Sequence, residues 1–107
     1  MALKNWSLNT VVASLVTDLV APAANKEVAI VGLIVCNCEA SNPAAVVITR
    51  TDSANNVKST IFKQTLLAGE SVHLDTKLFF ASSATPDKLR VVSDRVNTSF
   101  DANGDES

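Results

Sequence analysis

Aromatic side chains are scarce in this chain of 107 residues, which has no tyrosine, one tryptophan and four phenylalanines. Grooves that bind single-stranded nucleic acid use planar rings as platforms on which bases stack, and sugar-binding grooves use rings in the same way. No row of aromatic residues along this sequence supports such a groove. The composition therefore argues against a single-strand channel and leaves sugar binding as a weak alternative.

Histidine and cysteine are equally scarce, with His73 as the single histidine and Cys36 and Cys38 as the two cysteines. A catalytic triad needs a nucleophile, a base and an orienting group. An enzyme built from His73 with Asp75 or Asp94 is the least favoured hypothesis, because no clear nucleophile stands near His73 in sequence. We predict no catalytic residue.

The two cysteines are separated by one residue, whereas paired zinc ligands usually have two to four residues between them. Alternate residues of a strand point to the same side. On a flat strand they lie too far apart for a disulfide. We interpret Cys36 and Cys38 as small apolar residues, and we predict no metal and no cofactor.

Clustered positive charge is also missing, since nine basic and eleven acidic residues give a net charge of −2. A phosphate-binding face needs neighbouring Lys and Arg side chains, so no nucleic-acid partner is expected. The apolar run at residues 28–38 is shorter than the roughly 20 residues of a membrane-spanning helix. The start, MALKNWSLNT, lacks the apolar segment of a signal peptide. The expectation is one domain, made and kept soluble in a cytoplasm, without a membrane or small-molecule partner.

β-Branched residues are what the chain has in abundance, because Val, Ile and Thr account for 27 of its 107 residues. Such side chains pack well on pleated sheets and lose rotamer freedom in helices. The alternation of apolar and polar residues between turn sequences predicts strands at residues 8–20, 27–39, 44–52, 57–67, 71–82 and 88–100, some of them divided in two. The sequence thus predicts an all-β fold, a two-layer antiparallel β-sandwich or jelly roll of about seven or eight short strands.

The strand at residues 27–39 has the most distinctive pattern, because VAIVGLIVC contains no polar side chain. Its odd-numbered residues, Ala29 to Asn37, would form one face and its even-numbered residues, Ile30 to Cys38, the other. Since both faces are apolar, we expect both to be covered. Gly32 indicates a bulge or the close approach of another backbone.

Both ends of the chain are expected to lie outside the domain. We predict an N-terminal arm at residues 1–9, a single domain at residues 10–100 and a flexible acidic tail at residues 101–107. The tail sequence DANGDES resembles part of a calcium loop. With Asp101 as its first position, however, Gly104 is at the fourth position, whereas an EF-hand needs its glycine at the sixth.

Residues in the arm, in the loops and at the hairpin tip are the expected partner contacts, because such segments carry function in β-sandwiches. Trp6 either covers its own core or anchors the arm on a neighbouring subunit. Phe79 and Phe80 point to opposite faces, so one fills the core and the other is covered by the arm or meets a partner. The predicted interface set is Leu3, Trp6, Leu8, Asn42, Pro43, Ser53, Asn55, Asn56 and Phe80.

The order of features in this chain resembles that of small virion proteins of tailed bacteriophages. A turn, LVAPAANKE, precedes the apolar strand VAIVGLIVCN, and the hairpin AVVITRTDSANNVKSTIFKQTLL follows. Then come LAGESVHLDTKLFF and the closing KLRVVSDRVNTSF. The resemblance covers residues 5–100 and is a pattern of alternation and turns rather than a rigid motif. One departure is ATPD, which stands where related sequences carry a Gly-Asp turn.

The resemblance implies a non-enzymatic capsid cement or decoration protein that binds capsomer boundaries and stabilises the phage head. Its implied partners are the major capsid protein and further copies of itself, as a homo-oligomer. Its implied location is the capsid surface of the virion, after synthesis in the bacterial host cytoplasm. The alternative is a neck, tail or fibre module that binds a receptor or a glycan.

Overall fold

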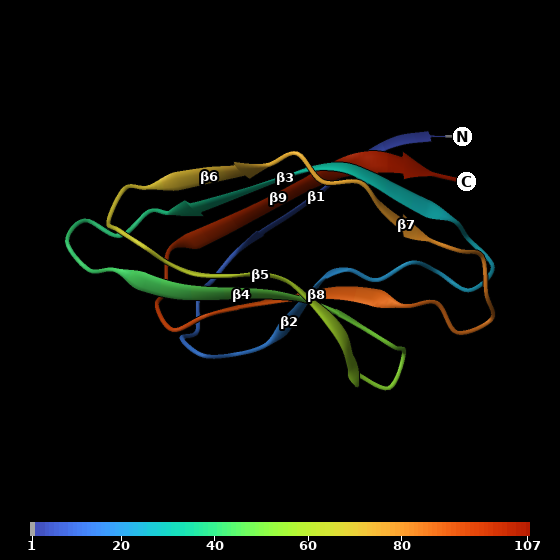
Figure 1. The fold of residues 1–107 in the computed structure, drawn as a ribbon, viewed down its shortest axis with the longest axis horizontal. Helices are drawn as coiled ribbons and strands as arrows, with labels where there is room; N and C mark the ends of the chain where they lie inside the picture. The colour runs from blue at the N-terminus through green and yellow to red at the C-terminus, as the bar shows by residue number, and fades with distance from the viewer. Residues whose placement is uncertain (1) are drawn as a thin grey trace.

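A computed structural model describes residues 2–107, which form strands joined by turns and loops and contain no helix. The strands are β1 (Ala2–Asn9), β2 (Thr17–Val20), β3 (Val28–Asn37), β4 (Ala44–Thr51), β5 (Val57–Leu66), β6 (Ser71–Leu74), β7 (Leu78–Phe80), β8 (Lys88–Ser93) and β9 (Thr98–Glu106). They build two stacked sheets, one in the order β1-β9-β3-β6 with β7 also on β3, the other in the order β2-β8-β4-β5 (Figure 1). The predicted all-β antiparallel sandwich is confirmed.

The strands pair like the two arms of one long hairpin whose apex lies at residues 52–56. From the apex outward, β4 pairs with β5, β3 with β6 and β7, β2 with β8, and β1 with β9. This long hairpin is rolled up, because β9 also pairs with β3 and β8 also pairs with β4. If β6 and β7 are counted as one interrupted strand, the result is an eight-stranded jelly roll.

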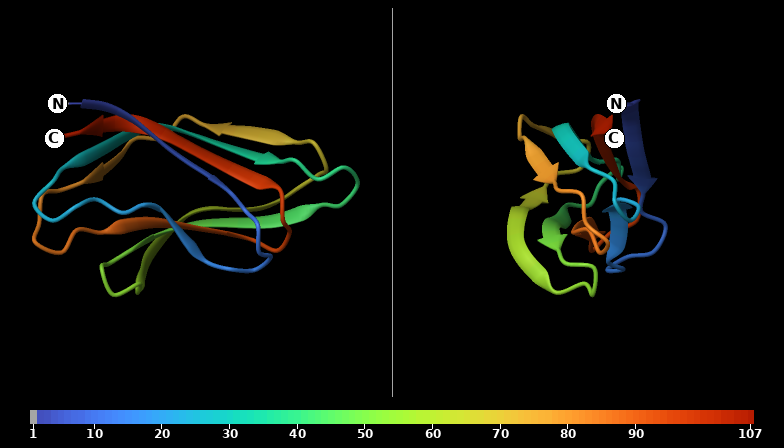
Figure 2. Two further views of the ribbon diagram at one scale, coloured as in Figure 1. Left: turned by 180° about the vertical axis from the view of Figure 1, so that it is seen from behind. Right: turned by 90° about the vertical axis from the view of Figure 1, so that its right-hand side faces the viewer.

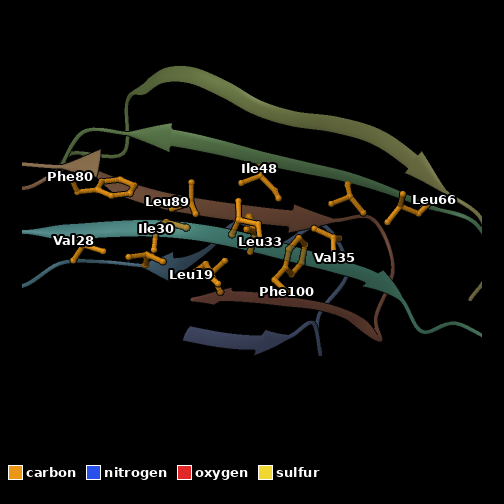
Figure 3. Packing of buried hydrophobic residues seen from close by; sticks show 14 of the residues in the cluster. Leu19, Val28, Ile30, Leu33, Val35, Ile48, Leu66, Phe80, Leu89 and Phe100 are labelled. Carbon is orange, nitrogen blue, oxygen red and sulfur yellow. The ribbon is translucent and has the colours of Figure 1, made fainter. Parts of the chain in front are cut away.

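The core lies between the two sheets, where large apolar side chains from both inner faces meet (Figure 3). Every second residue of a strand points inward, so each strand contributes alternate positions. The fully buried large side chains are Phe80, Phe100, Ile30, Leu33, Ile48, Leu66, Leu89, Val20, Val28, Val35, Val46 and Val91. Each of them stabilises the fold by roughly 1.5–3 kcal/mol through removal of apolar surface from water.

The central strand β3 is covered on one face only, so the expectation that both faces are covered is wrong for the single chain. Its register against β9 shifts between Ile30 and Gly32, which is the bulge that Gly32 predicted. The extra residue inverts the alternation, so Ile30 and Leu33 both point inward and Val31 points outward with 50% of its surface exposed. The predicted grouping of Val31 with Leu33 on one face is therefore also wrong.

Residues 101–106 are part of β9 and do not form the expected flexible acidic tail. β9 lies between β1 and β3 and pairs with both of them up to Glu106. Ser107 and Glu27 exchange backbone hydrogen bonds of 2.8 and 3.0 Å. In this segment small residues alternate with polar ones, so Ala102 and Gly104 are buried while Asp101 is half-buried and Asn103 is exposed. The polar composition of this segment predicted a tail because the residues that point inward, Ala102 and Gly104, are small and give no strong apolar pattern.

The described part of the expected N-terminal arm, residues 2–9, forms the edge strand β1. It pairs with β9 along its whole length, from Ala2 opposite Glu106 to Asn9 opposite Ser99. The strand expected at residues 8–20 is shorter, because residues 10–16 form a loop between β1 and β2. This loop carries the chain from one sheet to the other.

Candidate interaction surfaces

The polar groups considered for catalysis are divided between the two sheets, because His73 and Asp75 line one hollow of the first sheet and Asp94 lies in the second. His73 is exposed on β6 of the first sheet, whereas Asp94 follows β8 in the second sheet and accepts a 2.8 Å hydrogen bond from the backbone N–H of Ala45. Across residues 2–107, no three His, Cys, Asp or Glu side chains lie close enough together to hold a metal ion. No helix in this part of the chain has the length and apolar character to cross a membrane.

The first surface is the outer side of β3 and β7, which we call the β3 face and define as Ala29, Val31, Ile34, Cys36 and Phe79. Ala29 lies opposite Phe79 on the neighbouring strand, and both point outward. Val31 is 50% exposed and Phe79 is 54% exposed. This face is an uncovered apolar strip in the middle of the first sheet.

Polar groups surround the β3 face. Asp101 of β9 lies opposite Ile34 on one side, and His73 of β6 lies opposite it on the other. A hollow of about 220 Å³ adjoins the strip and is lined by Val31, Gly32, Leu33, Ile34, His73, Leu74, Asp75 and Asn103. An apolar centre within a polar rim is the usual composition of a protein–protein interface.

The two cysteines lie at one end of this face and are both free thiols. Their Sγ atoms are 3.2 Å apart, closer than the sequence led us to expect, because Cys38 follows the last residue of β3, where the chain is no longer a regular strand. A hydrogen bond with Ser71 lowers the pKa of Cys36, but the contact with Cys38 and burial together raise it above its ordinary value. Cys36 therefore stays protonated at neutral pH and is a poor nucleophile.

The second surface is the apolar loop, defined as Val11, Val12, Leu15 and Val16. These side chains are 80%, 53%, 55% and 43% exposed, respectively. Three of them, Val11, Val12 and Leu15, line a cavity of about 170 Å³ together with Leu8, Asn9, Thr10 and Thr17. Four large apolar side chains exposed together in one loop make it a candidate contact site.

The apolar loop is held at its base by hydrogen bonds to the β8–β9 connection. The backbone N–H of Thr10 donates to the Thr98 carbonyl at 2.9 Å, and the Thr10 hydroxyl donates to the Arg95 carbonyl at 2.9 Å. Ser14, at φ 62°, donates its N–H to the Ser93 carbonyl at 2.7 Å. Sequence reasoning missed this loop, although the doublet Val11-Val12 was a signal: two neighbours on a strand cannot both point to one core.

The third surface is the hairpin tip at residues 53–56, which projects from the body of the sandwich (Figures 1 and 2). Asp52 orders it, because its carboxylate accepts hydrogen bonds of 2.9 Å from the N–H groups of Ala54 and Asn56. The bond from Asn56 is the main reason that the pKa of Asp52 is lowered. Asn55 has φ 71°, as the turn sequence predicted.

The base of this hairpin is fixed by Asp87, whose carboxylate accepts hydrogen bonds from Lys58 Nζ at 2.9 Å and Arg50 Nε at 3.1 Å. These two cations, Lys58 first, lower the pKa of Asp87. The Arg50 guanidinium also lies 4.5 Å from the centre of the Phe80 ring. The hairpin is thereby joined to the loop between β7 and β8.

The structure does not bring the predicted interface residues together on one surface. Leu3 is 91% exposed on β1. Trp6 and Leu8, on the same strand, are partly buried against the chain's own core. Asn42 and Pro43 are exposed between β3 and β4, and the hairpin tip belongs to the second sheet.

Phe80 is a correction, because it is fully buried and cannot serve as a surface contact in the folded chain. It lies opposite Val28, whose side chain also points inward. Its neighbour Phe79 is the exposed member of the pair.

Comparison with protein-family models gives no match, and comparison with curated proteins gives no match either. Among solved structures, a chain in the structure of the infectious bursal disease virus Gx strain aligns with 94% of this chain at 11% identity and a TM-score of 0.42. A chain from the Gt strain aligns with 99% at 13% identity and a TM-score of 0.38. This chain spans 32% and 30% of the lengths of those two chains. At such values nothing is transferred from them to this chain.

Proposed function

We propose that this chain is a non-enzymatic structural protein of a virion, a capsid cement or decoration protein that binds the major capsid protein through the β3 face. The observation that carries the proposal is that β3 has apolar side chains on both faces, whereas the rest of the chain covers only one of these faces. Val31 and Phe79 are therefore left about half exposed. A second protein that covers them removes this apolar area from water.

The other features suit a protein that is repeated many times over a capsid. Each copy needs only modest affinity if bound copies act together across capsomer boundaries. The polar rim, with Asp101 and Asn103 on one side, gives such a contact its orientation. The net charge of −2 keeps the surface from binding packaged nucleic acid. The ordered hairpin tip provides a further contact with a neighbouring capsomer.

The experiment is co-sedimentation of the purified protein with its cognate particles, followed by thermal challenge of the decorated particles. We expect binding and a higher temperature of particle disruption. The double variant Val31→Asp/Phe79→Ser should bind roughly tenfold or more weakly, because each side chain contributes on the order of 1.5 kcal/mol when fully covered. The control is Leu67→Ser, which removes a 67% exposed side chain from the turn before β6.

Two outcomes would contradict the proposal. If the wild-type protein neither sediments with particles nor changes their resistance to heat or chelators, the capsid role is wrong. If the double variant binds as well as Leu67→Ser does, the β3 face is not the contact. Circular dichroism of each variant separates a lost contact from a lost fold.

The second candidate is a neck, tail or fibre module that binds a receptor or glycan, and the hollow beside β3 favours it. His73, Asp75 and Asn103 offer hydrogen-bonding groups next to the apolar side chain of Val31. Jelly rolls serve both capsid and lectin domains, so the fold accommodates either role. A glycan array is the test, with His73→Ala as the matched variant. Absence of any binder above background would end this candidate.

A further inference from the structure

The outer edges of the two sheets differ in how well they are protected against pairing with another chain. In the second sheet, β2 has four residues and a register shift, and β5 has two register shifts. In the first sheet, β6 and β7 have four and three residues. Short strands and bulges are the usual means by which proteins block edge pairing. These edges are therefore poor templates for an added strand.

The remaining edge, β1, has none of these protections. It has eight residues, contains no proline and pairs with β9 without a register shift. It is the outermost strand of its sheet, with no further strand of residues 2–107 beyond it (Figure 2, right). Lys4 is its one charged residue, and its Nζ already lies 3.2 Å from the Glu106 carboxylate. A long, regular edge of this kind is a template for another strand.

The backbone groups at this open edge can be identified. Thr10 directs its N–H and its C=O toward the β9 side, where they bond with Thr98 and Asn97. In an antiparallel pair, successive residues bond alternately to either side. The even-numbered residues of β1 therefore bond to β9, and the odd-numbered ones turn their N–H and C=O groups to the open edge. These are Leu3, Asn5, Ser7 and Asn9.

We propose that a second copy of this chain pairs with this edge, β1 against β1 in antiparallel orientation about a two-fold axis. The argument for a second copy is that β1 carries exposed apolar groups at both ends. Leu3, near its start, is 91% exposed, and the apolar loop directly follows its end. Antiparallel pairing places the start of each strand beside the end of the other. Leu3 of each copy then lies next to the start of the apolar loop of the other copy, which a parallel arrangement does not allow.

The register follows from the same groups. With Trp6 on the two-fold axis, Leu3 lies opposite Asn9 and Asn5 lies opposite Ser7, so all four open-edge residues find partners. Lys4 then faces Leu8 and no like charges are opposed. The first sheets of the two copies become one continuous sheet, and the β3 face remains free. The dimer therefore goes beyond the proposed virion role and does not depend on it.

The first experiment is sedimentation equilibrium of the wild-type chain over a concentration series. We expect a mass twice that of the 11.3 kDa monomer at high concentration. Leu3→Asp/Val12→Asp should weaken dimerisation by about tenfold or more, because it buries charges at both apolar contacts. Leu67→Asp, an equally exposed site outside the contact, should not. A wild-type chain that stays monomeric up to about 0.1 mM, or a double variant that dimerises normally, overturns the proposal.

The second experiment tests orientation and register by disulfide trapping in a Cys36→Ser/Cys38→Ser background. Leu3→Cys and Asn9→Cys are both at exposed positions, so the fold should tolerate them. A mixture of the two variants should form a cross-linked dimer. Either variant alone should not form one, because the two identical cysteines of a dimer would then be six residues, or roughly 20 Å, apart along the paired strands. Equal cross-linking of single variants and mixture, or none in the mixture, would show that β1 does not pair in this way.

Discussion

Single residues decide how closely neighbouring strands of one sheet can approach each other, and Gly104 is the clearest case. A Cβ atom at this position of β9 would lie 1.9 Å from the carbonyl oxygen of Ala29 and 3.0 Å from the Cα of Ile30. Both obstacles are backbone atoms beside the β3 bulge, so neither can rotate away. Glycine is required there because the bulge brings the two backbones together.

We predict that Gly104→Ala lowers the free energy of unfolding by about 3 kcal/mol, as overpacking against backbone does. The control is Gly32→Ala, whose Cβ would meet only the Asn103 side-chain oxygen at 3.3 Å, near the surface. Its cost should be about 1 kcal/mol or less, since that side chain can shift. Urea denaturation followed by circular dichroism measures both. Equal destabilisation by the two variants would contradict this account of Gly104.

Residue patterns predicted part of this local structure. Gly32 indicated a bulge or the close approach of another backbone. The adjacency of Phe79 and Phe80 predicted that one of the two rings is buried. Which of the two rings is buried was not predictable, because it depends on the alignment of β7 with Val28 across the sheet. The bulge also inverted the alternation in β3, so Val31 could not be assigned to its face from sequence alone.

Among the elements, the β4–β5 hairpin followed most directly from the sequence. Its two strands alternate, and the SANN turn supplies an asparagine for the left-handed position that Asn55 occupies. Its attachment to the rest of the molecule did not follow. Asp87 is 29 residues beyond Lys58, and the rolled topology alone brings them together.

We predict that Asp87→Asn lowers the free energy of unfolding by about 1 kcal/mol at pH 7. The pKa of Asp87 is lowered in the folded chain, so its stabilisation is present above the unfolded value of about 3.9 and is lost as pH falls through the folded value. The melting temperatures of variant and wild type should therefore converge as the pH falls below about 4. The control Asp75→Asn removes the same charge from the connection between β6 and β7. A difference that does not shrink as the pH falls would argue against the ion pairs as its source.

At the scale of the whole molecule, the sequence predicted the class of fold and missed the pairing order. Strand periodicity and turn residues are local, and they predicted two antiparallel layers. The pairing of β1 with β9 joins residues about a hundred positions apart, and no local pattern encodes it. For that reason the sequences of residues 1–9 and 101–107, polar on one side and small or mixed on the other, predict an arm and a tail. The predicted interface residues do not form one surface for the same reason: a surface depends on which distant strands pair, and local patterns do not encode that.

We predict that deletion of residues 101–107 prevents stable folding. The deletion removes most of β9, including the buried Ala102 and Gly104, and leaves β1 and β3 without their shared neighbour. Far-ultraviolet circular dichroism and a thermal melt of the truncated chain are the measurements. Asn103→Ser, an exposed position in the same segment, is the control and should fold normally. A truncated chain that melts cooperatively near the wild-type temperature would show that the segment is dispensable.

The antiparallel pairing of the first and last strands also places the start of β1 beside the end of β9 (Figure 1). A short linker of glycine and serine could therefore join these two ends without breaking the backbone pairing between β1 and β9. Opening the resulting ring at Ala54 would give a circular permutant in which β9 and β1 form a hairpin in the middle of the chain. The new termini would then lie at the tip of the β4–β5 hairpin. A protein fused to an end of that permutant would be attached at the projecting hairpin tip, whereas a protein fused to an end of the present chain is attached beside β1.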